Sequence, residues 1–278
     1  MTPAPSPNSS RSPRPNSFRT RRVMDPVRSH RSKVVVDAAR LHRSRDRKRA
    51  GLTLLEGPHL LAEAVAAGAM VRSVFAVGHD EKSASLARAH GVELLVVDER
   101  ALARLAGTES PRGPVAVVEI PPPAPLGSES ALLVSWGVSD PGNVGTMIRT
   151  AAGFGWRFGY SPGTADPWSP KVLRSGAGCQ FRVALTPISD LEELRQAGFK
   201  VLAAVVEGGR APEMPLPTPL ALLVGEEATG LPDVVIAGSD DRVSISMPGG
   251  IESLNAAVAA GIMVYAISKH LGQPRGRG

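Results

Sequence analysis

The stretch ISMPGGIESLNAAVAAG, residues 245–261, decides the fold class. Apolar residues lead into a Gly-rich loop, and Ser253 then opens a helix that the pattern extends to about His270. A helix that is apolar on almost every side has to be buried. Asn255, in its first turn, is the polar exception, and it is either a satisfied buried amide or a functional group.

A second segment, DPGNVGTMIRTAAGFG at residues 140–155, also leads from a turn into a helix. Asn143 is a candidate N-cap, and Arg149 lies in the second turn of the helix. A helix N-terminus followed by an arginine favours binding of a phosphate. The alternative for Arg149 is an ordinary surface arginine.

A third segment, LLVGEEATGL at residues 222–231, places a glycine-bracketed loop after an apolar strand. In open α/β sheets, ligands bind beyond the carboxyl ends of the strands. Gly225 would let a ligand approach the backbone closely, and Glu226 and Glu227 could accept hydrogen bonds from a ribose or a positive group. A charged strand–helix turn is the alternative.

Outward from these segments, strands and helices alternate. This pattern predicts an α/β fold whose C-terminal domain, residues 131–272, has a parallel sheet with helices on both faces. The expected strands are Ala131–Val138, Arg182–Pro187, Val201–Val206, Leu220–Val224 and Val243–Ser246. The expected helices are Asn143–Phe154, Pro170–Gly176, Leu191–Ala197 and Ser253–His270.

Residues 29–120 predict a smaller α/β domain. A basic helix is expected at 29–49, followed by strands Leu52–Leu55, Val71–Val77, Glu93–Val97 and Val115–Val118 and by helices His59–Ala67, Lys82–His90 and Ala101–Ala106. Four prolines among residues 121–125 predict a stiff linker over 121–130. The alternative is a rigid surface loop inside a single domain.

The net charge of +6 is concentrated at one end of the 278-residue chain. Residues 1–50 hold 14 of the 32 Lys and Arg residues but 3 of the 26 Asp and Glu residues. Residues 1–28 and 273–278 are predicted to be disordered tails, since the Pro-, Ser- and Arg-rich stretch 1–28 cannot bury enough surface to offset its ordering. The basic end favours nucleic-acid binding through phosphates, and a merely solvated tail is the alternative.

Composition excludes several classes of protein. The longest apolar run, residues 256–267, has 12 residues, whereas a membrane span needs about 20. A single cysteine, Cys179, leaves no disulfide framework and no multi-cysteine metal site, which fits the cytoplasm. There is no P-loop, no G-x-G-x-x-G after a strand, and no histidine within the three segments. We therefore expect no membrane, no metal and no histidine-driven acid–base chemistry.

Together and in this order, the three segments resemble the SpoU/TrmH family of RNA 2′-O-methyltransferases in the SPOUT superfamily. The resemblance covers about residues 131–270, and residues 29–120 more loosely resemble an L30e-like substrate-binding domain. It implies a C-terminal trefoil knot, a homodimer, S-adenosylmethionine as cofactor and RNA as substrate. The implied cofactor-binding residues are Gly225, Ile245, Met247 and Leu254. The implied catalytic residues are Arg149, Asn143, Glu227, Ser253 and Asn255.

The resemblance implies methyl transfer to a ribose 2′-hydroxyl, with 23S ribosomal RNA as the expected substrate. Transfer RNA and a non-catalytic RNA-binding role on the same fold are the alternatives, whereas the missing dinucleotide fingerprint disfavours an oxidoreductase. Glu226, Ser246 and Ala257 depart from the residues common in the family. A guanidinium stays charged at neutral pH and accepts no proton, so we expect Arg149 to clamp a phosphate and stabilise the developing alkoxide.

Overall fold

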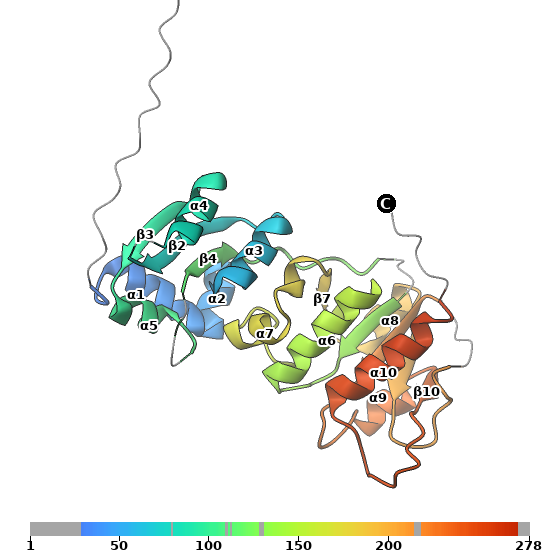
Figure 1. Cartoon of the computed structure of the whole chain (residues 1–278). Coiled ribbons are helices and arrows are strands. Elements are labelled where there is room, and N and C mark those ends of the chain that lie inside the picture. The colour runs from blue at the N-terminus through green and yellow to red at the C-terminus, as the bar shows by residue number, and fades with distance from the viewer. Residues whose placement is uncertain are drawn as a thin grey trace, which may run out of the picture.

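The computed structural model describes residues 29–78, 80–108, 111, 113–127, 131–213 and 218–271. The expected tails at 1–28 and 273–278, and the last part of the expected linker, lie outside these residues. Within them the chain forms two lobes that lie side by side (Figure 1). Each lobe is built around its own β-sheet.

The N-terminal lobe has a four-stranded sheet of order β1-β4-β2-β3. β4 is antiparallel to β1 and β2, whereas β2 and β3 are parallel. The elements are α1 (Lys33–Ala39), η1 (Arg40–His42), α2 (Ser44–Ala50), β1 (Leu52–Glu56), α3 (Pro58–Ala66), β2 (Val71–Val77), α4 (Glu81–Ala89), β3 (Glu93–Val97), α5 (Glu99–Leu105) and β4 (Val115–Glu119).

The single basic helix expected at 29–49 is wrong. The chain leaves the helical conformation at Arg43, so α1 and η1 are separated from α2. The break is held by Arg47, which donates hydrogen bonds of 2.8 Å to the carbonyl oxygens of Leu41 and His42. Periodicity could not show this break, because residues 42–49 contain no apolar residue whose spacing could reveal it.

The C-terminal lobe has a six-stranded, all-parallel sheet of order β10-β8-β9-β5-β6-β7, which confirms the expected α/β class. The elements are β5 (Ala131–Ser135), α6 (Pro141–Phe154), β6 (Arg157–Tyr160), α7 (Pro170–Ser175), η2 (Cys179–Phe181), β7 (Leu185–Pro187), α8 (Leu191–Gln196), β8 (Lys200–Ala204), β9 (Leu220–Val224), α9 (Asp233–Ala237), β10 (Asp241–Val243) and α10 (Ala256–Ser268).

Successive residues of a strand point to opposite faces of the sheet, and the residues at consecutive positions here are apolar. Both faces of the sheet are therefore apolar. Leu133 and Leu222 belong to a core with α6, α7 and α10, whereas Leu132 and Leu223 belong to a second core with α8 and α9. α6 and α10 lie next to each other over the first face (Figure 1). Helices therefore cover both faces, as expected.

Besides the three-residue η2, two elements escaped the sequence analysis. β6 has four residues, including Arg157 and Gly159, and it lacks the alternation that marks a strand. Arg157 is nevertheless buried, and it donates hydrogen bonds to the carbonyl of Pro125 and to the hydroxyl of Thr186. α9 is a five-residue helix, too short for helical periodicity to identify.

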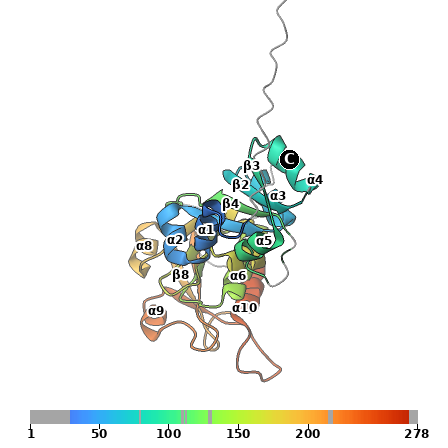
Figure 2. The ribbon, with the colours of Figure 1, turned by 90° about the vertical axis from the view of Figure 1, so that its left-hand side faces the viewer.

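The two lobes share a buried boundary. A single apolar cluster includes Leu55 and Leu60 of the first lobe and Val172 and Leu173 of the second. Figure 2, a view turned by 90°, looks at the N-terminal lobe with the C-terminal lobe behind it. Across the boundary, α7 contacts β1 and η2 contacts α3. The proline segment runs along the edge of the second sheet, where the Ala124 amide donates to the carbonyl of Leu185 at 3.0 Å.

An ion pair joins the lobes. The Arg47 guanidinium, with 3% of its side chain exposed, lies 2.6 Å from an Asp166 carboxylate oxygen. Thr53, fully buried, adds a 2.6 Å hydrogen bond to the carbonyl oxygen of Trp168. Removing one partner of a buried ion pair leaves an uncompensated charge, which costs far more than breaking an exposed pair.

We expect Asp166→Asn to lower the free energy of unfolding by about 3 kcal/mol, because it strands the buried Arg47 charge. Urea unfolding at neutral pH measures this loss. Asp37→Asn is the matched control, since it breaks the exposed pair with Lys33 and should cost less than about 1 kcal/mol. Equal effects of the two variants would show that the interlobe pair does not hold the lobes together.

Candidate active site

A cavity of about 360 Å³ lies at the carboxyl ends of β8 and β9, against the start of α10. All four residues expected to bind the cofactor line it, namely Gly225, Ile245, Met247 and Leu254. Glu227 and Ser253 line it as well. Segments that are far apart in the chain thus meet at one hollow at the carboxyl edge of the parallel sheet.

Three polar side chains next to this cavity form one hydrogen-bonded cluster. The Asn143 side-chain amide donates to a Glu227 carboxylate oxygen at 3.1 Å. The Asn255 amide donates to the Asn143 side-chain oxygen at 2.8 Å and lies 3.2 and 3.3 Å from the two Glu227 oxygens. The structure therefore brings together one predicted residue from each of the three motifs.

Both helix starts differ from the expected N-caps. Asp140 caps α6 by accepting from the Asn143 amide at 2.8 Å, so Asn143 is already inside the helix and its side chain is free to face Glu227. Asn255, not Ser253, caps α10, accepting from the amides of Ala257 and Val258 at 3.1 and 3.2 Å. The signal for Asp140 was present in the sequence, since a proline at the first helical position follows it.

The loop after β9 closes tightly on itself at Gly225. A Cβ placed on Gly225 would lie 2.2 Å from the carbonyl carbon of Gly230, so only glycine fits without opening the loop. Glu226 turns away from the cluster and accepts from the Ser139 amide at 2.6 Å. Glu226 thereby ties the loop after β9 to Ser139, which lies 87 positions away in the chain, so no local sequence pattern could have indicated this role.

Arg149 and Ser253 stand apart from the cluster. Arg149 is exposed on α6 and does not line the cavity of its own chain. It lies near Cys179, whose thiol pKa is raised mainly by burial although Arg149 and Arg182 lower it. Ser253 is exposed at the cavity, and its hydroxyl has no hydrogen-bond partner among the described residues.

Two absences hold for the part of the chain that the structure describes. No group of three or more His, Cys, Asp or Glu side chains there could hold a metal ion. No described helix combines the length and the apolar character that crossing a bilayer requires.

Comparison with known proteins identifies the chain. The SpoU rRNA Methylase family matches residues 130–265, and the MRM3-like substrate binding domain matches residues 33–116. The 23S rRNA (guanosine(2553)-2′-O)-methyltransferase RlmP of Bacillus subtilis is 33% identical over 227 residues, which cover 80% of this chain and 90% of that protein. The chain belongs to the SpoU methylase family.

Solved structures agree with this assignment. An AdoMet-bound rRNA methyltransferase from Sinorhizobium meliloti superimposes with a TM-score of 0.79 at 26% identity, covering 89% of this chain and 98% of that one. The SpoU methyltransferase AviRb from Streptomyces viridochromogenes, also in complex with AdoMet, gives 0.77 at 28% identity, covering 89% and 100%. The expected family and the expected enzyme class, an RNA methyltransferase, are confirmed.

We expect Asn255→Ala to lower the free energy of unfolding of this SpoU methylase by about 2 kcal/mol. The substitution removes the cap of α10 and leaves the buried Asn143 oxygen without its donor. Ser253→Ala, two residues earlier, should change stability by less than about 0.5 kcal/mol. Chemical denaturation of both variants makes the comparison, and a larger loss for Ser253→Ala would contradict the capping assignment.

Proposed function

We propose that this protein transfers a methyl group from S-adenosylmethionine to a ribose 2′-hydroxyl of 23S ribosomal RNA. Two of the three motif segments line one cavity, and Asn143 of the remaining segment is hydrogen-bonded to Glu227 and Asn255 beside it. This convergence carries the proposal. The similarity to RlmP along 90% of that protein supports both the reaction and the class of RNA. Family membership and the AdoMet in two structural relatives support the cofactor.

The cavity suits the cofactor in size and chemistry. Small-molecule sites are mostly apolar hollows of roughly 300–1,000 Å³ with a few polar groups at fixed positions. Here Val224, Ile245 and Met263 supply apolar surface, whereas Glu226 and Glu227 supply carboxylate acceptors. We assign cofactor contacts to Gly225, Ile245, Met247 and Leu254. When bound, S-adenosylmethionine supplies an electrophilic methyl group on a sulfonium.

The residues of the chain would then hold the ribose and direct its proton. Asn143, Glu227 and Asn255 are locked to one another, so their proposed role is to fix the loops around the reacting groups. Ser253 has an exposed hydroxyl that can contact the ribose. Positioning of this kind accounts for several kcal/mol of barrier lowering.

Arg149 would bind an RNA phosphate and stabilise the alkoxide that develops at the 2′-oxygen. A guanidinium stays charged and accepts no hydrogen bond, so the proton has to pass to a phosphate oxygen or to water. Arg149 is exposed and outside the cavity of its own chain. It therefore reaches a reacting ribose either through movement of RNA toward α6 or from a second chain.

A homodimer is part of this proposal. Val258, Ile262 and Tyr265 recur on one stripe of α10 and are 51%, 40% and 52% exposed, and Phe154 of α6 stacks edge-on against Tyr265. Exposed apolar patches of this kind mark interaction surfaces. Sedimentation equilibrium should give twice the 29.1 kDa chain mass, and a monomer at micromolar concentration would contradict the proposal.

Two further expectations, on the chain topology and on the cellular location, accompany the proposed function. We infer that the C-terminal chain passes through a trefoil knot, which the SPOUT-type neighbours support and which tracing an experimental structure would test. We also place the enzyme in the cytoplasm with its ribosomal substrate, and cell fractionation tests that placement. Transfer RNA methylation is the competing function.

Mapping of ribose methylation tests the proposed function directly. Deletion of the gene should remove one 2′-O-methyl mark from 23S rRNA and leave transfer RNA unchanged. A mark lost from transfer RNA would favour the competing function. The absence of heat on titration with S-adenosylmethionine would contradict the assigned cofactor site.

Arg149→Ala should lower the turnover of RNA methylation at least a hundredfold and leave the affinity for S-adenosylmethionine unchanged, because Arg149 does not line the cavity. Radiolabelled methyl transfer and calorimetry measure the two quantities. Arg195→Ala on α8, at the other face of the sheet, is the control and should retain full activity. Near-normal turnover of Arg149→Ala would reject the assigned role.

A further inference from the structure

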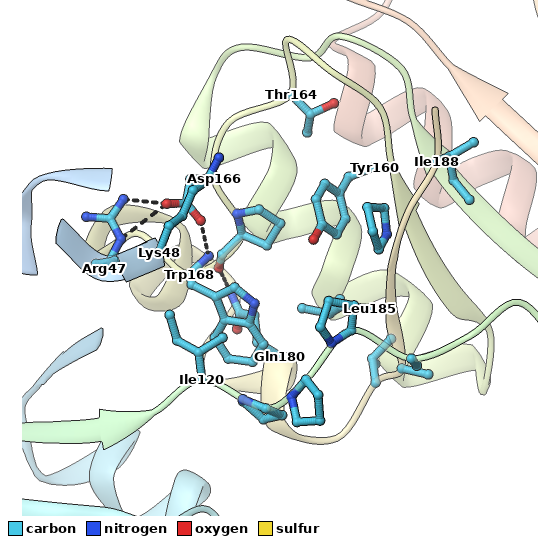
Figure 3. A pocket seen from close by; sticks show the side chains of 18 of the residues that line it. Arg47, Lys48, Ile120, Tyr160, Thr164, Asp166, Trp168, Gln180, Leu185 and Ile188 are labelled. Atoms are coloured by element: carbon cyan, nitrogen blue, oxygen red, sulfur yellow. Dashed lines mark hydrogen bonds and ion pairs between the residues drawn. The ribbon is translucent and has the colours of Figure 1, made fainter. Parts of the chain in front are cut away.

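A second and larger cavity lies between the two lobes. Its volume is about 1060 Å³, and it is bounded by α2, the proline segment before β5, the end of β6 and the segment around η2. Figure 3 shows Arg47 and Asp166 at one end of it and Ile188 at the other, with Tyr160, Trp168 and Leu185 between them. None of its lining residues also lines the smaller cavity.

The walls combine flat apolar surfaces with polar groups that have no protein partner. Tyr160, Trp168 and Phe181 line the cavity together with the rings of Pro121, Pro122 and Pro123. Within the part of the chain that the structure describes, the Tyr160 hydroxyl and the Trp168 indole N–H form no hydrogen bond. Aromatic faces beside open donors and acceptors are the features that bind unpaired bases.

Gln180 is part of the same wall. Its side chain is 2% exposed, and its amide nitrogen donates to the carbonyls of Pro167 and Val172 at 3.3 and 2.9 Å. Its oxygen has no hydrogen-bond partner among the described residues. This oxygen is inaccessible to solvent, so Gln180 fixes the shape of the wall through the two hydrogen bonds of its amide nitrogen.

The charge of the cavity suits a polyanion. Asp166 is the one acidic residue that lines it, and Asp166 is already paired with Arg47. Lys48 also lines the cavity, is exposed, and has no ion pair in the described ranges. The wall therefore carries one unpaired positive charge, which attracts a phosphate and repels a cation.

Position links this cavity to the proposed methylation site. The Gly137 amide donates to the hydroxyls of Ser161 and Thr164, which line the interlobe cavity, at 2.9 and 3.2 Å. Two residues later, the Ser139 amide donates to Glu226 of the smaller cavity. The strands that bear the two cavities, β6 and β9, flank β5 and so lie about 10 Å apart.

We propose that the interlobe cavity binds one unpaired nucleoside of the RNA substrate, outside the site of methyl transfer. The base lies among Tyr160, Trp168 and the proline rings, and Lys48 contacts a backbone phosphate. This inference rests on the proposal that the protein acts on RNA. It adds a specificity site at which the RNA contacts both lobes at once, because residues of both lobes form its walls.

Filling the cavity tests this site without removing any wall group. Ala124 lines the cavity, and only its backbone amide bonds to the sheet edge, so Ala124→Trp places an indole in the space. We expect about tenfold weaker binding of an unmodified 23S rRNA transcript and a matching rise in the KM for that RNA, since the loss of one stacked base has an effect of at least this size.

Two controls make the result specific. Ala124→Ser keeps the cavity open and should bind the transcript like the unchanged protein. Calorimetry with S-adenosylmethionine should give the same affinity for both variants, because the smaller cavity is separate. Equal RNA affinity of Ala124→Trp and Ala124→Ser would overturn the proposal.

Ultraviolet cross-linking of the unchanged protein to the same transcript provides a measurement that does not depend on a variant folding. We expect a nucleotide adduct on Tyr160 or Trp168, and adducts found solely on other peptides would overturn the proposal. Adducts in the cavity without methyl transfer would refute the proposed reaction and keep this site. Methyl transfer without such adducts, together with normal RNA binding by Ala124→Trp, would refute this site and keep the proposed reaction.

Discussion

The hydrogen-bonded cluster of Asn143, Glu227 and Asn255 is the constraint on which the candidate active site depends. It joins residues separated by 84, 28 and 112 positions in the chain. A side-chain amide both donates and accepts, so two asparagines and one carboxylate can satisfy one another in a single arrangement. The loop after β9 and the start of α10 are thereby fixed against α6, and the cavity is the space left between them.

The parallel sheet makes this cluster possible. Strands that all run the same way end at the same edge, and two buried faces leave that edge as the place where polar loops gather. β5 is central, since the turn that follows it bonds through Gly137 to one cavity wall and through Ser139 to the other. The proposed methylation site and the proposed nucleoside site are therefore two parts of one edge.

The interlobe boundary gives the N-terminal lobe a mechanical role. Arg47 belongs to the basic end of the chain, yet it is buried and holds Asp166 instead of facing RNA. The proline segment lies against the edge of the second sheet and forms part of a cavity wall. A lobe fixed in this way keeps its exposed basic residues, such as Lys48 and Arg49, at a constant place relative to the carboxyl edge of the second sheet.

The sequence by itself determined the α/β class, the parallel sheet and the three segments that carry polar residues, because periodicity and glycine spacing report local burial and turns. It did not identify β6, whose Arg157 is buried through partners far along the chain, nor the break at Arg43. The tertiary structure alone decided that Asn143 pairs with Glu227 and Asn255. It also decided that Arg149 lies outside the smaller cavity of its own chain and that a second cavity lies between the lobes. Each of these depends on which distant residues meet, and a local pattern contains no information about that.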